Sequence, residues 1–316
     1  MKRMIGILGE ALIDFIGTKD SSHSACFYPY PGGCALNASI ASARLGSDVL
    51  YIGKLSSDMF GALLRNHLAS NSIQIPDSFR SCPQQTMIGF AQLDDHGSAS
   101  YAFYIEGTTV VSLTTEEILQ ILDEHPVEYL HIGSVALTLE QSGSAIITAL
   151  QQMKHVPFLF LDPNVRLTMI QDRTSYQKRL MKAVSLSSIV KLSDEDLSFL
   201  FPDMPVLRAV STLLDAGAAH VVLTKGSRGI EWHASTGFTI SQPALAVRVV
   251  DTVGAGDTVS GALLNYCDFN SITDPLRLDK AAAEEALMFA AKAASFTCMK
   301  KGCDPPYRSD VVTYPN

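Results

Sequence analysis

A glycine-rich run in the last quarter of the chain carries the residues best suited to chemistry. It reads Asp251-Thr-Val-Gly-Ala-Gly-Asp257 and precedes a helix-forming stretch at residues 258–266. Two glycines allow a tight turn and let a ligand approach the bare backbone. The N–H groups of residues 254–257 would then point outward at a helix N-terminus, where unpaired donors and the helix dipole favour an anion. The run therefore predicts a backbone anion hole.

Phosphoryl transfer is the reaction that fits this anion hole, because a transferring phosphoryl group spreads negative charge over its equatorial oxygens. Asp257 stands beside the hole as the candidate acceptor for the proton of an attacking hydroxyl. The helix N-terminus favours its ionised form, so we expect a weak base that orients the hydroxyl and takes its proton late. The alternative is a plain strand-to-helix turn with Asp257 as its N-cap. The sequence contains no P-loop and no Gly-x-Gly-x-x-Gly run after a strand as a competing phosphate motif.

Short β-branched or aromatic runs alternate with stretches of helical spacing, which predicts a largely parallel sheet covered by helices on both faces. The expected strands are residues 4–8, 49–52, 129–132, 158–161, 189–192, 220–224 and 247–250. The expected helices are residues 36–45, 61–69, 142–153, 176–184, 205–216, 255–266 and 281–297. The fold class is therefore α/β.

One region departs from this alternation. Residues 86–93 and 98–105 are strand-like segments joined by the turn-rich tetrapeptide Asp94-Asp95-His96-Gly97, and residues 24–30 offer a third strand. We expect a small β lid made from about 15–31 and 86–107; the alternative is an edge hairpin of the main sheet. No repeat, low-complexity tract or linker divides the chain, so residues 1–316 are expected to form one domain.

Composition excludes several classes of function. With 47% hydrophobic and 18% charged residues, the chain can bury a sizeable core. A net charge of -8 provides no basic field for nucleic acid, and no apolar run has the length of a membrane span. Six scattered cysteines without a Cys-x-x-Cys pair indicate reduced thiols in a cytoplasmic protein.

At the glycine-rich run the chain resembles the ribokinase-type (PfkB) carbohydrate kinases, whose signature places Asp-Thr-x-Gly-Ala-Gly-Asp before a helix. Further motifs follow in the family's order: Gly9-Glu-Ala-Leu-Ile-Asp14, Pro31-Gly-Gly-Cys-Ala-Leu-Asn37, Asp162-Pro-Asn-Val-Arg166 and Thr224-Lys-Gly226. The resemblance spans nearly the whole chain, and it looks closest to the bacterial fructokinases. It implies a three-layer α/β/α sandwich, with ATP phosphorylating a sugar hydroxyl.

The resemblance also implies roles for individual residues. The catalytic residues would be Asp257, the anion hole of Gly254, Ala255 and Gly256, and Arg166, whose guanidinium would contact the phosphate. The sugar would be held by Asp14, Gly32, Gly33, Asn37, Arg166 and Asp257. ATP would lie against Lys191, Ser193, Thr224, Lys225, Gly226, Gly229, Thr252, Gly254 and Gly256, with the wall of its adenine pocket at residues 291–302.

Metal ions enter through the same resemblance. Magnesium is expected with ATP, held in part through water by Asp196, and a monovalent cation such as potassium would face the backbone carbonyls of Asp251 and Val253. The chain departs from the family here, because the usual Asn-x-x-Glu is replaced by Ser193-Asp-Glu-Asp196.

Other assignments stay open at the level of sequence. A nucleoside kinase or a 2-keto-3-deoxygluconate kinase of the same family is the alternative enzyme, and a non-catalytic sugar or nucleotide sensor is the alternative class. The expected partners are a small sugar and ATP. An exposed lid edge also favours pairing of two copies, so a homodimer through the lid is expected.

Overall fold

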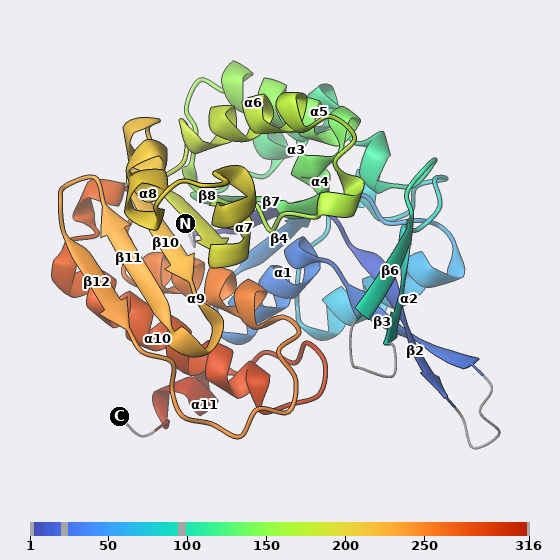
Figure 1. Cartoon of the computed structure of the whole chain (residues 1–316). Helices are drawn as coiled ribbons and strands as arrows, with labels where there is room; N and C mark the ends of the chain where they lie inside the picture. Colours follow the sequence, from blue (N-terminus) through green and yellow to red (C-terminus); the bar gives the residue numbers. More distant parts are fainter. Residues whose placement is uncertain (1–2, 20–24, 94–98, 315–316) are drawn as a thin grey trace.

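The computed structural model describes residues 3–19, 25–93 and 99–314, and its main element is an eight-stranded sheet (Figure 1). The strand order is β12-β11-β10-β9-β8-β7-β1-β4. These strands are β1 (Ile5–Leu8), β4 (Val49–Ile52), β7 (Tyr129–Gly133), β8 (Phe158–Asp162), β9 (Ile189–Ser193), β10 (His220–Thr224), β11 (Ile230–Ala234) and β12 (Thr239–Gln242). In this order, the six strands β10-β9-β8-β7-β1-β4 are parallel to one another. Strand β11 is antiparallel to β10, and β12 is antiparallel to β11. The predicted parallel sheet is confirmed.

One predicted strand is wrong. Residues 247–250 form no strand, and Val249 and Val250 are more than half exposed. The hairpin of β11 and β12 forms that edge of the sheet, and residues 247–250 do not pair with it. The backbone N–H of Val250 donates instead to the carbonyl of Cys298, at 2.8 Å. Tertiary context overrides β propensity here.

Helices cover both faces of the sheet (Figure 1). One face, with apolar side chains from the strands, packs against α1 (Cys34–Arg44), α2 (Met59–Ser70), α9 (Ala255–Phe269), α10 (Lys280–Cys298) and α11 (Arg308–Val312). The other face packs against α3 (Thr115–Glu124), α4 (Ser134–Thr138), α5 (Glu140–Gln152), α6 (Arg173–Val184), α7 (Asp194–Leu200) and α8 (Val206–Asp215). The three-layer α/β/α arrangement is confirmed.

A second, four-stranded sheet stands apart from the main one, in the order β3-β2-β5-β6. Its strands are β2 (Leu12–Lys19), β3 (Ala25–Gly32), β5 (Ile88–Leu93) and β6 (Ala99–Tyr104). Both predicted segments and the third strand therefore belong to a separate sheet, and the alternative of an edge hairpin in the main sheet is wrong. The predicted turn at residues 94–97 lies outside the described residues.

Alternation along the parallel strands brings polar side chains to one place. His131 pairs with Phe160 across β7 and β8, and Phe160 pairs with Ile189 of β9. Because side chains two residues apart share a face, Asp162 and Lys191 lie on the same side of the sheet as His131. That side carries α1 and α9. Among the described residues, no helix is both long and apolar enough to cross a membrane.

Candidate active site

The glycine-rich run forms the start of α9, as the sequence predicts. Gly254 is the residue before the helix and adopts a left-handed φ of 77°. The N–H of Thr258 makes the first helical hydrogen bond, to the carbonyl of Gly254 at 2.8 Å, while the N–H of Ala255 donates to Thr252 at 3.2 Å. The N–H groups of Gly256 and Asp257 therefore precede the first helical hydrogen bond, where a helix has donors to offer an anion.

Asp257 lies in the first turn of α9 and is held by two side-chain amides. The Asn37 Nδ2 donates to Oδ2 at 2.7 Å, and the Asn164 Nδ2 donates to Oδ1 at 3.3 Å. Asn37 comes from α1, and Asn164 follows β8 in a left-handed conformation with φ of 37°. Sequence reasoning missed Asn164, although asparagine is one of the few residues that adopt this backbone readily. Each carboxylate oxygen thus has its own donor.

Burial changes the expected strength of this base. The Asp257 side chain is almost fully buried, which raises its pKa above the ordinary value. The Asp162 carboxylate raises the pKa further, whereas Asn37 and Lys191 oppose the rise. The expectation of a weak base considered the helix N-terminus alone and left out burial. Because burial raises the pKa, the carboxylate is a stronger proton acceptor than expected.

A buried ion pair lies next to Asp257. Lys191 Nζ is 2.8 Å from Asp162 Oδ2, and the Ser260 hydroxyl donates to the same oxygen at 2.8 Å. Asp162 and Lys191 occupy neighbouring positions on β8 and β9, and Ser260 is on α9. Lys191, expected beside ATP, is thus engaged inside the protein. Sequence reasoning had no signal for this pair, because 29 residues separate its members.

Asp14 sits between two glycines of the small sheet. A Cβ on Gly32 would come within 2.4 Å of Asp14 Oδ2, and one on Gly89 within 2.8 Å of Oδ1, so a side chain at either position would displace the Asp14 carboxylate. Burial raises the pKa of Asp14 to about 6, and the charge of Arg166 opposes that rise. The predicted sugar-side residues Asp14 and Arg166 are thus close enough for their charges to interact.

Glu10 organises the start of α1, which carries Asn37. Its carboxylate accepts the backbone N–H of Cys34 at 3.0 Å and that of Ala136 at 3.2 Å, so one side chain holds the starts of α1 and α4. Burial raises the pKa of Glu10 to about 7 against these hydrogen bonds. Gly33 precedes α1 with φ of 110°, and a Cβ there would meet the Glu10 carbonyl at 2.7 Å. Glu10 therefore shapes the predicted sugar side, although it was not a candidate residue.

Asp196 fastens the loop that carries Asn164 and Arg166. Its Oδ1 accepts the Val165 N–H at 2.8 Å, and its Oδ2 accepts the Ser193 N–H at 2.9 Å. The Ser193 hydroxyl accepts the Asp196 N–H at 3.0 Å, completing a capping box at the start of α7. The departure to Ser193 and Asp196 thus has a structural role. Arg166 itself is exposed.

Five of the predicted nucleotide residues lie at or just beyond the carboxyl ends of β9 and β10: Ser193, Thr224, Lys225, Gly226 and Gly229. Thr224 is the last residue of β10, and its hydroxyl donates to the carbonyl of Leu192 at 3.4 Å. Lys225 forms an ion pair with Glu231. Gly226 and Gly229 take left-handed φ values of 55° and 94° in the next turn. In open α/β sheets, ligands bind outside the carboxyl ends of strands.

The loop before α9 is tied to the segment after α10. The Asp251 carboxylate accepts the N–H of Val253 at 3.1 Å and that of Gly302 at 2.9 Å. The carbonyl of Cys298 accepts the N–H groups of Val250 and Asp251. The predicted cation loop and the predicted adenine wall therefore form one hydrogen-bonded unit.

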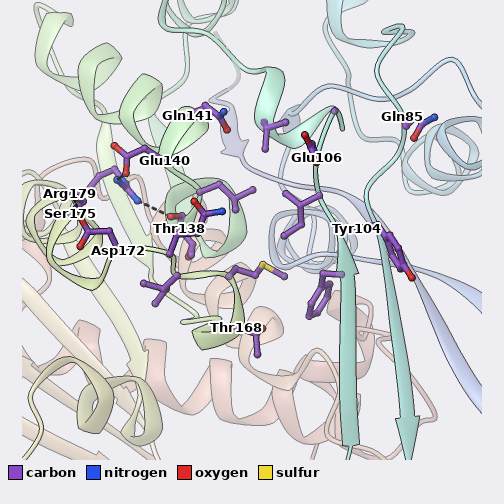
Figure 2. A pocket seen from close by; sticks show the side chains of 18 residues that line it. Gln85, Tyr104, Glu106, Thr138, Glu140, Gln141, Thr168, Asp172, Ser175 and Arg179 are labelled. Atoms are coloured by element: carbon purple, nitrogen blue, oxygen red, sulfur yellow. Dashed lines mark hydrogen bonds and ion pairs between the residues drawn. The ribbon is translucent and has the colours of Figure 1, made fainter.

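A cavity of about 1140 Å³ lies between the small sheet and the helical layer (Figure 2). Its walls come from β6, from the start of α5 and from residues 168–172, which include Thr168 and Asp172. Phe103 lines it, and a Cβ on Gly89 would touch both Phe103 and the Asp14 carboxylate at 2.8 Å. The cavity therefore adjoins the predicted sugar side of the site.

Comparison with known proteins matches this chain to carbohydrate kinases over nearly its whole length. The family model described as "pfkB family carbohydrate kinase" matches residues 2–310. A fructokinase of Rhizobium leguminosarum bv. trifolii is 35% identical over 270 residues, covering 83% of this chain and 78% of the relative.

Solved structures agree in fold. A fructokinase from Xylella fastidiosa superposes with a TM-score of 0.87 at 25% identity, covering 99% of this chain and 98% of the other. A fructokinase from Vibrio cholerae O395, solved with fructose, ADP and a calcium ion bound, gives a TM-score of 0.79 at 25% identity, covering 96% and 94%.

Proposed function

Because the chain belongs to the pfkB family of carbohydrate kinases, we propose that it transfers the γ-phosphate of ATP to a hydroxyl of fructose or a closely similar sugar. The observation that carries this proposal is the buried Asp257 carboxylate, held by two amides at the start of α9. The donor nucleotide is supported by the Vibrio cholerae relative, which binds ADP together with fructose.

Asp257 and its neighbours supply the proposed steps. Asn37 and Asn164 hold the carboxylate so that it can accept the acceptor hydroxyl's hydrogen bond and then its proton. The N–H groups of Gly256 and Asp257 meet the oxygens of the transferring phosphoryl group. The exposed Arg166 side chain, on a loop held by Asp196, adds a guanidinium cation that can contact the same oxygens.

The residues present fit the expected metal ions. When bound, magnesium would neutralise negative charge on the phosphate groups of ATP. Asp196 would hold it through water, because its two oxygens each accept one backbone N–H and retain a further lone pair. The Asp251 and Val253 carbonyls would face the monovalent cation. Their loop is fixed by the Asp251 carboxylate, which gives such a site a rigid wall.

The four-stranded sheet would act as a lid on the main body of a single kinase domain. It carries Asp14 and Gly32 on neighbouring strands, so its closure would bring sugar contacts toward Asp257 and exclude water. Tyr28 and Tyr30 on the edge strand β3 are exposed, which supports the predicted pairing of two copies through this sheet.

An ADP-release assay across acceptors tests the proposed function. The panel contains fructose, ribose, other ketoses, 2-keto-3-deoxygluconate and nucleosides, with Asp257→Asn protein as the blank. We expect the highest kcat/KM with fructose or another ketose. Preference for a nucleoside or for the keto acid would move the protein to another branch of the family. Tight sugar binding without ADP release would instead identify a sensor.

The pH dependence of sugar binding should report on Asp14. Its pKa is raised to about 6, so the carboxylate becomes protonated as pH falls through that value and loses its capacity to accept sugar hydroxyls. The sugar KM should therefore rise below about pH 6, while in Asp14→Asn it should be higher and insensitive to pH in that range. A parent KM constant from pH 5 to 8 would contradict this role. Asp77→Asn, at an exposed carboxylate, serves as control.

A further inference from the structure

The buried pair of Lys191 and Asp162 has a position that the steps above do not explain. Both side chains are nearly inaccessible, with 5% and 0% of their surface exposed. Buried ion pairs are costly to form, because two charges leave water, and they often contribute little net stability. Three elements meet at this pair, since Ser260 of α9 also donates to Asp162. The location of the pair therefore needs a reason beyond stability.

Lys191 lies against the backbone at the start of α9. A Cβ on Gly256 would come within 3.1 Å of Lys191 Nζ, so the glycine leaves the ammonium in contact with the helix start. Gly256 and Asp257 supply the N–H groups proposed to meet the phosphoryl oxygens. The ammonium thus sits on the inner side of the anion hole, out of reach of water, where its charge is weakly screened.

Few other charges act on Asp257 from the elements packed around it. The groups facing it or its immediate partners are Cys34 and Asn37 of α1, His131 of β7, Asp162 and Asn164 of β8 and its following loop, Lys191 of β9, Ser260 of α9, and Cys303 beyond α10. Burial raises the pKa of both thiols and lowers the pKa of His131 to about 4, so these three are neutral near pH 7. Glu10 acts on the neighbouring Cys34 and holds the starts of α1 and α4, whereas Asp162 and Lys191 are the charged groups that act on Asp257 itself.

We propose that Lys191 and Asp162 are positioning residues that act on Asp257 as two opposed charges. The ammonium stabilises the ionised carboxylate and the anion bound at the helix start, and the Asp162 carboxylate makes Asp257 a stronger proton acceptor. The inference rests on the proposed function, because it takes Asp257 as the base.

The opposed arrangement has a chemical logic. Lys191 alone would stabilise the phosphoryl anion, but it would also lower the pKa of Asp257 and so make it a weaker proton acceptor. Asp162 alone would strengthen the base but would repel the incoming phosphoryl oxygens. Together they retain the ammonium beneath the anion hole while offsetting its effect on Asp257. A purely structural brace among β8, β9 and α9 would have no such effect on proton transfer.

Replacing Asp162 or Lys191 by a neutral residue should shift the low-pH limb of the profile of kcat against pH, and the two variants should shift it in opposite directions. In Asp162→Asn the pKa of Asp257 falls, and the limb shifts to lower pH; in Lys191→Met the pKa rises, and the limb shifts to higher pH. Each shift should be on the order of one pH unit, the size expected for a neighbouring charge. Lys54→Met is the matched control, because Lys54 is also a buried lysine in an ion pair, with Glu117 at 2.7 Å.

The double variant Asp162→Asn/Lys191→Met keeps the test decisive if a single variant fails to fold, because it leaves no unpaired buried charge. Its acid limb should return toward that of the parent, while kcat falls about tenfold or more because the ammonium is missing. Parent-like kcat in the double variant, or shifts of the same sign in both single variants, would overturn the proposal. Carbon-13 NMR titration of the Asp257 carboxyl gives the same pKa changes without catalysis, so a protein inactive on every acceptor would refute the proposed function separately.

Discussion

Asp257→Asn should lower kcat by about two to four orders of magnitude, the usual contribution of a positioned acid or base. The asparagine has nearly the shape of the aspartate, but its amide cannot take up the proton of the acceptor hydroxyl. One of its two terminal positions becomes an NH2 group facing Asn37 or Asn164, which weakens the clamp. Removing a buried carboxylate offsets this cost, because burial already disfavours the charged form.

Steady-state ADP release gives kcat, and thermal unfolding tests the fold. We expect the unfolding midpoint temperature of the Asp257→Asn protein to stay within a few degrees of that of the parent protein. Asp279→Asn is the matched control, since Asp279 is the N-cap of α10 and asparagine serves that position equally well. Near-parent turnover in the Asp257→Asn protein would remove Asp257 from the chemistry.

Gly254→Ala should lower kcat by about two to three orders of magnitude, comparable to losing one donor of an oxyanion hole. A Cβ at this position would lie 2.1 Å from Cys303 Sγ, and the left-handed φ of 77° adds backbone strain for alanine. The start of α9 must shift to relieve the contact, and the N–H groups of Gly256 and Asp257 would shift with it.

Two further variants separate contact from strain. Gly46→Ala has a comparable left-handed φ of 105°, but a Cβ there meets no atom nearer than 3.9 Å, so it should lose some stability and keep parent kcat. Combining Gly254→Ala with Cys303→Gly removes the contact and should recover part of the lost turnover. A Gly254→Ala protein with unchanged kcat would show that the helix start does not bind the phosphoryl group.

Local sequence patterns predicted the parts of the fold that depend on local chemistry. The buried parallel strands are continuous apolar runs, and the start of α9 follows from two glycines before a helical stretch. The valines of residues 247–250 show the limit, because a strand needs a neighbour and the sequence does not say whether one is available. The same pattern of β-branched residues is a strand in β10 and an exposed loop here.

The site residues divide along a similar boundary. Asn37 and Asp257 were expected from motifs, and the structure brings their side chains to 2.7 Å. Glu10 was not expected, because its effect depends on two backbone N–H groups that lie 24 and 126 residues away. Likewise, the capping box of Ser193 and Asp196 can be read from their spacing, whereas the third contact, with Val165, depends on the packing of β8 beside β9.

The hydrogen bonds between residues 250–253 and residues 298–302 have a dynamic consequence. Because Asp251 and Cys298 bond in both directions across these segments, neither segment can open without breaking bonds of the other. Amide hydrogen exchange should therefore show one cooperative opening event shared by the Asp251 and Gly302 N–H groups, even though 51 residues separate them. A nucleotide that contacts either segment should slow exchange in both. Nucleotide binding and the opening of the loop before α9 would then be coupled in a single equilibrium.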